Sequence, residues 1–141
     1  MDTKLNELYS ILGSIDSLYR DASIKLGVTE TEMNILYVLC YEGSGCNQSC
    51  LYKKTGITKS TINSALHKMV ENGLVELRSG DKRNVRLFLT AEGEELSERT
   101  AGRLIQIEQE IFEGWSAEDI DRFLALNRSY HNDMKEKIEK L

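Results

Sequence analysis

Short polar and basic side chains gather in one stretch of the sequence, from residue 58 to residue 68. Hydroxyl, amide and imidazole groups donate and accept hydrogen bonds, so they suit contact with the edges of base pairs. The candidates for such contact are Ser60, Thr61, Asn63, Ser64 and His67. Lysines bind phosphate instead, and Lys59, Lys68, Lys53 and Lys54 lie in or just before this stretch. Together these residue types predict a partner that is double-stranded DNA.

The charge distribution along the chain supports this interpretation. The chain has 141 residues and a formal net charge of −5, which alone is unfavourable for a polyanionic partner. Residues 47–90, however, contain eight basic and three acidic side chains, a net charge of +5. The remaining residues therefore carry −10. This separation predicts a basic DNA-binding surface on an otherwise acidic protein.

The spacing of apolar residues predicts the helix that carries the polar stretch. A helix capped by Thr58 and closed by Gly73 would bury one face, because its apolar residues recur at helical intervals. These residues are Ile62, Ala65, Leu66, Met69 and Val70. The polar side chains then point outward. A shorter helix over residues 47–55 precedes it, and Gly56 makes the turn between the two.

Two β-type stretches, 74–78 and 84–89, follow this helix and predict a β-hairpin. Helix, turn, helix and hairpin form a winged helix-turn-helix, in which the second helix enters the major groove. At the hairpin tip, Lys82 and Arg83 are expected to contact DNA, with Asp81 orienting the arginine toward a narrow minor groove. Arg78 and Arg86, on the facing strands, suit either phosphate contacts or simple surface ion pairs.

Residues 51–94 resemble the MarR family of bacterial transcription regulators. The matching text is LYKKTGITKSTINSALHKMVENGLVE, the D-x-R of residues 81–83, and Leu89-Thr90-Ala91-Glu92-Gly93, which is similar to the family's L-T-x-x-G. The wing is shorter than in many members of the family. The resemblance implies an obligate homodimer, a wing arginine in the minor groove, here Arg83, and a repressor modulated by a small-molecule effector. The sequence does not identify that effector.

The predicted fold is mainly α-helical with a small β-hairpin wing and terminal dimerisation helices. Amphipathic helices are expected over residues 4–25, from a Thr29 cap through an apolar run, from Thr90 to about residue 113, and from Ser116 to the end. The apolar stripes of the first and last helices have few partners in so small a domain. They predict a homodimer, and hence a pseudo-palindromic operator.

Three regions are expected from this organisation. Residues 1–28 form an amino-terminal dimerisation helix, residues 29–90 the winged helix-turn-helix core, and residues 91–141 the carboxyl-terminal helices that complete the dimerisation region.

The cysteines leave a second function open, a thiol-based redox or metal-sensing regulator on the same fold. Cys46 and Cys50 bracket the start of the third helix, whose amino end could lower a thiol pKa. Cys40 lies in an apolar run and is expected to be buried. The spacing of the three matches neither a disulfide framework nor a structural zinc site.

Other functional classes receive less support. No Gly-rich phosphate loop or nucleophile motif is present, so neither an enzyme nor a cofactor is expected. No apolar segment is long enough for a membrane span, and no leader segment is evident, which predicts a cytoplasmic protein without a membrane partner. A dimeric protein-interaction module without DNA binding remains as a further alternative, against which the basic patch argues.

Overall fold

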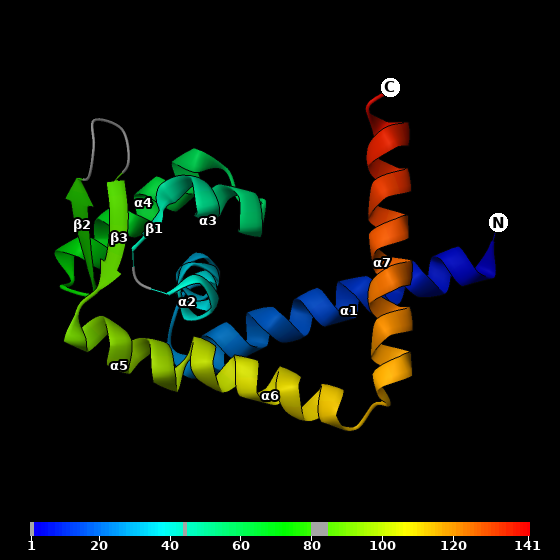
Figure 1. Cartoon of the computed structure of the whole chain (residues 1–141), viewed down its shortest axis with the longest axis horizontal. Helices are drawn as coiled ribbons and strands as arrows, with labels where there is room; N and C mark the ends of the chain where they lie inside the picture. The colour runs from blue at the N-terminus through cyan, green and yellow to red at the C-terminus, as the bar shows by residue number, and fades with distance from the viewer. Residues whose placement is uncertain (1, 44, 80–84) are drawn as a thin grey trace. The chain divides into compact units, whose positions relative to one another are not determined.

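The computed structural model describes residues 2–43, 45–79 and 85–141 (Figure 1). The chain divides into two compact units, Met1–Ile105 and Gln106–Leu141. The predicted wing-tip residues Asp81, Lys82 and Arg83 lie outside the described residues. None of the helices in the described ranges is long and apolar enough to cross a membrane.

A central helix organises the first unit. This is α2, Glu30–Glu42, whose Ile35 and Leu36 are fully buried. Around it pack α1 (Thr3–Leu26), α3 (Gln48–Thr55), α4 (Lys59–Glu71) and α5 (Ala91–Arg99). In Figure 1, α3 and α4 lie on one side of α2, and the hairpin lies beside α4. Each fully buried aliphatic side chain contributes about 1.5–3 kcal/mol to this core.

Polar caps determine where these helices begin. The Thr29 hydroxyl accepts a hydrogen bond from the Glu32 amide at 3.1 Å, as the sequence predicted. The other predicted caps are also confirmed: Thr58 before α4, Thr90 before α5 and Ser116 before α7 (Ala117–Ile138). The caps satisfy amide groups that would otherwise lack a partner, so they hold the helix boundaries in place.

The wing is a three-stranded antiparallel sheet in the order β1-β3-β2. The predicted hairpin is confirmed as β2, Val75–Ser79, and β3, Val85–Leu89, with Leu77 opposite Leu87. The additional strand β1, Cys46–Asn47, pairs with β3 and was not predicted. Two residues are too few to show an alternating pattern, and their partner is distant in sequence.

The long helix predicted from Thr90 to residue 113 is interrupted. It consists of α5 and α6 (Ala101–Glu113), separated at Thr100, whose φ of −118° and ψ of −89° are not helical. The Thr100 hydroxyl donates to the Leu96 carbonyl oxygen at 2.6 Å. A β-branched residue that bonds to the preceding turn in this way competes with regular helix geometry.

Two predictions of burial were wrong. Val70, placed on the apolar face of α4, is 38% exposed because it lies at the edge of that face, in the last turn of the helix. Cys40 is exposed as well, in the last turn of α2, and its Sγ lies 3.0 Å from the Ser97 hydroxyl oxygen.

The second unit has little interior of its own. It contains most of α6 and all of α7, and every side chain of α7 stays at least partly exposed. An aromatic cluster forms at the turn between these helices: Trp115 contacts Phe123 edge-to-face at 5.2 Å between ring centroids, and Phe112 contacts both. This arrangement leaves much apolar surface in contact with solvent.

The first turn of α5 passes so close to Leu74 that residue 93 has no room for a side chain. A Cβ atom at Gly93 would overlap the Leu74 carbonyl oxygen and lie 3.2 Å from Leu89 Cδ2. We expect Gly93→Ala to lower the free energy of unfolding by about 1–3 kcal/mol, because the backbone must move to make room. Urea denaturation at a fixed protein concentration measures the change.

Gly13→Ala is the matched control. Within the described part of the chain, nothing lies within 4 Å of a Cβ atom at Gly13, which is in the middle of α1. This change should raise the free energy of unfolding by about 0.5–1 kcal/mol. Equal stability of Gly93→Ala and wild type would contradict the close contact with Leu74.

Candidate nucleic-acid interface

Helix α4 has two chemically distinct faces. Ile62, Leu66 and Met69 are buried to 1% exposure or less, which orients the helix about its axis. All seven DNA-contact candidates on α4 are exposed, as predicted: Lys59, Ser60, Thr61, Asn63, Ser64, His67 and Lys68. The structure therefore brings these residues together on the outward side of one helix.

The turn before α4 has a defined geometry. Gly56 adopts the left-handed conformation, with φ of 70°, and its amide donates to the Tyr52 carbonyl oxygen at 3.0 Å. The Thr55 hydroxyl donates to the Leu51 carbonyl oxygen at 2.6 Å and accepts from the Ile57 amide at 3.1 Å. A left-handed glycine and a side-chain hydrogen bond together end α3 abruptly. They bring α4 into a fixed orientation beside α3.

A tyrosine on α3 connects the two helices, and sequence reasoning did not find it. The Tyr52 hydroxyl donates to Asn63 Oδ1 at 3.0 Å and lies 3.3 Å from Gln48 Oε1. The Lys59 Nζ atom lies 5.6 Å from the centroid of the Tyr52 ring, within range of a cation–π interaction. Apolar periodicity describes one helix at a time, so it carries no signal for a contact made across a turn.

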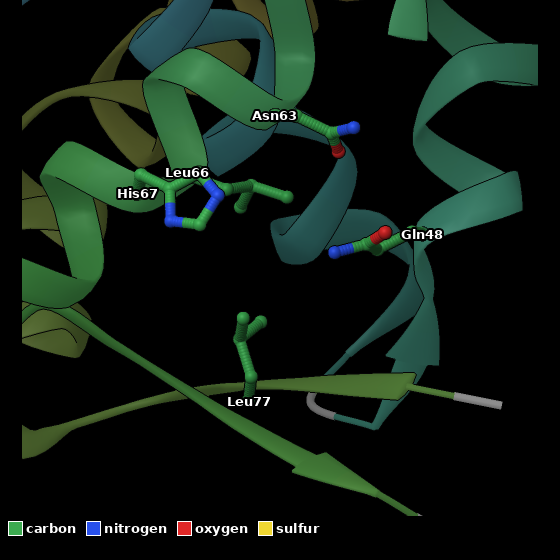
Figure 2. A pocket seen from close by; sticks show the side chains of 5 residues that line it. All are labelled: Gln48, Asn63, Leu66, His67 and Leu77. Carbon is green, nitrogen blue, oxygen red and sulfur yellow. The ribbon is translucent and has the colours of Figure 1, made fainter. Parts of the chain in front are cut away.

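A pocket of about 240 Å³ opens beside this connection. Figure 2 shows its lining side chains, Gln48 from α3, Asn63, Leu66 and His67 from α4, and Leu77 from β2. Leucine side chains and polar groups both face the shared space (Figure 2). The pocket brings Asn63 and His67, which were predicted as base readers, next to Gln48, which was not.

The strands of the wing carry two arginines opposite each other, Arg78 on β2 and Arg86 on β3. Arg78 pairs with Glu76 at 3.0 Å, and its guanidinium lies 4.1 Å from the centroid of the Phe88 ring. Arg86 donates to the Gly45 carbonyl oxygen at 3.1 Å. Like charges facing each other across strands are unfavourable unless an anion lies nearby. Both side chains are exposed, so the strand pair presents positive charge to solvent.

The thiol of Cys46 differs from the reactive group that its position suggested. Burial, together with the neighbouring Cys50 and Glu42, raises its pKa to about 11. The thiol is therefore neutral near pH 7, and thiolate character is what reactivity requires. Among the described residues, no three His, Cys, Asp or Glu side chains are grouped so that they could hold a metal ion.

The elements described above define a winged helix-turn-helix, in which α3, its turn and α4 are followed by the β2–β3 hairpin. Residues 26–83 match the model of the MarR family. No match was found among curated proteins.

Solved structures extend the similarity over the whole chain. A MarR family regulator from Neisseria meningitidis, NMB1585, has a TM-score of 0.86 at 20% identity, covering 99% of both chains. A MarR family transcriptional regulator from Silicibacter pomeroyi has a TM-score of 0.70 at 25% identity, covering 89% of this chain and 86% of that one. The PcaV transcriptional regulator from Streptomyces coelicolor, solved with its natural ligand, has a TM-score of 0.64 at 20% identity, covering 86% and 89%.

The resemblance to the MarR family that the sequence predicted is therefore confirmed. The chain has the fold of MarR-family transcription regulators.

The pH dependence of alkylation tests the environment of Cys46. Because its pKa is raised to about 11, we expect its rate of reaction with iodoacetamide to rise about tenfold per pH unit from pH 7 to pH 10. Site-resolved mass spectrometry of the folded protein measures this rate. A rate that reaches its plateau below pH 8 would mean that the amino end of α3 activates the thiol after all.

Proposed function

We propose that the protein is a sequence-specific DNA-binding transcription regulator that acts as a homodimer. The observation that carries this proposal is the exposed polar and basic face of α4, oriented by the buried Ile62, Leu66 and Met69. In a winged helix-turn-helix, the helix in this position enters the major groove. The similarity to the MarR-family fold supports the proposal.

The side chains divide by chemistry into two kinds of contact. Base edges are read by the short polar groups Ser60, Thr61, Asn63, Ser64 and His67. Phosphates are bound by Lys59 and Lys68 at the ends of this face, and by Arg78 and Arg86 on the wing strands. At the wing tip, Arg83 enters the minor groove, as the family resemblance implies. The sequence pattern adds Asp81, to orient the arginine, and Lys82 as a further DNA contact.

Homodimerisation is supported by the exposed apolar side chains of the terminal helices. On α1, Leu5, Tyr9 and Leu18 are each at least 60% exposed, and on α7 Leu126 is 65% exposed. Monomeric proteins rarely leave apolar surface of this extent in contact with water. A two-fold dimer would present two copies of α4 to a pseudo-palindromic operator, with half-sites one helical turn or a multiple apart.

Regulation by a small molecule completes the proposal. PcaV, which shares the fold, was solved with its natural ligand. An effector would relieve repression here if it bound more tightly to an arrangement of the dimer that does not fit the operator. A protein of this kind acts in the cytoplasm, where it meets its operator, and performs no catalysis.

The salt dependence of operator binding tests the DNA-binding proposal. An operator selected from random DNA should lose about 10³–10⁵ in affinity between 50 and 200 mM salt if the dimer neutralises roughly six to ten phosphates. Lys68→Ala should reduce the slope of log affinity against log salt by about 1 for each lysine removed. Fluorescence anisotropy measures both quantities.

Lys25→Ala, at the end of α1, is the matched control and should leave the slope unchanged. If no sequence is enriched and binding does not respond to salt, the DNA-binding proposal fails. The protein-interaction module without DNA binding would then be favoured.

Disrupting the apolar face of α1 tests the dimer. Leu12 is 48% exposed within one chain. Leu12→Glu should convert the dimer to a monomer at micromolar concentration, because a carboxylate in the interface would lose its hydration. Ser10→Glu, about 200° away around the same helix, is the control and should stay dimeric. Sedimentation velocity distinguishes the two states, and a dimeric Leu12→Glu variant would contradict this interface.

A further inference from the structure

We infer that Tyr52 is a positioning residue for base recognition, because it holds the Asn63 amide so that its NH₂ group faces the DNA. Tyr52 lies on α3 rather than on the helix that reads the bases. This inference rests on the proposed DNA-binding function and adds a chemical preference to it.

The hydrogen-bonding capacity of the phenol carries the argument. A tyrosine hydroxyl has one proton, so it donates to one acceptor at a time. Asn63 Oδ1 at 3.0 Å is closer to it than Gln48 Oε1 at 3.3 Å. The bond to Tyr52 therefore engages the acceptor end of the Asn63 amide. In Figure 2 the Asn63 oxygen faces the pocket beside Gln48, and the nitrogen points in a different direction.

The consequence is a preference at one base position. An exposed NH₂ group donates hydrogen bonds, so it matches the acceptors that guanine, adenine and thymine present in the major groove. Cytosine presents only its amino group there, which is a donor. Asn63 should therefore discriminate against cytosine on the strand that it contacts.

The same tyrosine also supports a phosphate contact. Its ring lies 5.6 Å from Lys59 Nζ. This contact uses the face of the ring and is independent of the hydroxyl group. Removing the hydroxyl alone should thus affect base preference and leave the electrostatic part of binding intact.

A double-mutant cycle on the full-length protein tests the inference. The variants are Tyr52→Phe, Asn63→Ala and the double mutant, and the readouts are a sequence-preference profile selected from random DNA and the salt slope. Tyr52→Phe should reduce discrimination about fivefold, the value of one neutral hydrogen bond, at the position that Asn63→Ala also relaxes. It should have no further effect in the Asn63→Ala background, and the salt slope should match wild type.

Tyr41→Phe is the matched control, because Tyr41 is an exposed tyrosine of α2 in ring contact with Tyr37. Its preference profile should equal that of wild type. Additive effects of Tyr52→Phe and Asn63→Ala, or an unchanged preference at the Asn63 position, would overturn the inference. If wild type itself selects no sequence, the proposed function fails first, so the two failures are distinguishable.

Asn63→Asp provides a second test that does not depend on the stability of the tyrosine variant. The Tyr52 hydroxyl can still donate to one carboxylate oxygen, but the other oxygen can now only accept. Preference at that position should shift toward cytosine, whose amino group is a donor. A wild-type preference for cytosine, or no shift in Asn63→Asp, would show that the amide faces the other way.

Discussion

The burial of one face of α4 is the constraint on which the rest of the structure depends. Ile62, Leu66 and Met69 are excluded from solvent against the core that surrounds α2. A helix turns through about 100° per residue. When these three residues are buried, the polar residues between them therefore face outward. The surface proposed to read DNA is thus a direct consequence of core packing. A substitution in the core would rotate or loosen the whole recognition face.

Electrostatics acts on the surface that packing has oriented. The chain is acidic as a whole, so the basic surface is a local exception to its overall charge. On the wing, Arg78 and Arg86 face each other at the cost of mutual repulsion. Glu76, Phe88 and the Gly45 carbonyl oxygen hold these guanidinium groups in place within the protein. A phosphate backbone lying along the strands would offset the remaining repulsion.

Much of this could be predicted from the sequence because the signals are local. The α4 periodicity, the threonine and serine caps and the hairpin pattern each lie within one short segment of the chain, the longest being residues 74–89. Each is confirmed, apart from the burial of Val70 at the edge of the α4 face. Features that depend on residues distant in the sequence were not predicted. Strand β1 exists only because β3 lies beside it, and the break at Thr100 reflects one hydroxyl bonded to the preceding turn. The hydrogen bond between Tyr52 and Asn63 joins two helices, so the sequence pattern of either helix alone could not predict it.

The pKa of Cys46 shows that the fold can outweigh a local effect that the sequence predicts. Helix amino ends do lower thiol pKa values, and Cys46 lies just before α3. Its burial, Cys50 and Glu42 together have the larger, opposite effect and raise the pKa. Neither effect could be seen without the fold, because burial depends on which elements cover the residue.

Photocrosslinking from the outward face of α4 tests the central claim most directly. A benzophenone group attached at Ser64→Cys in a background without the native cysteines should crosslink to bases of the bound operator. The same group at Asn34→Cys, an exposed position on α2, should not. Crosslinking to bases from residue 64 alone is the result that the account predicts. Operator binding with no crosslink from residue 64 would contradict it, because α4 could not then lie in the groove.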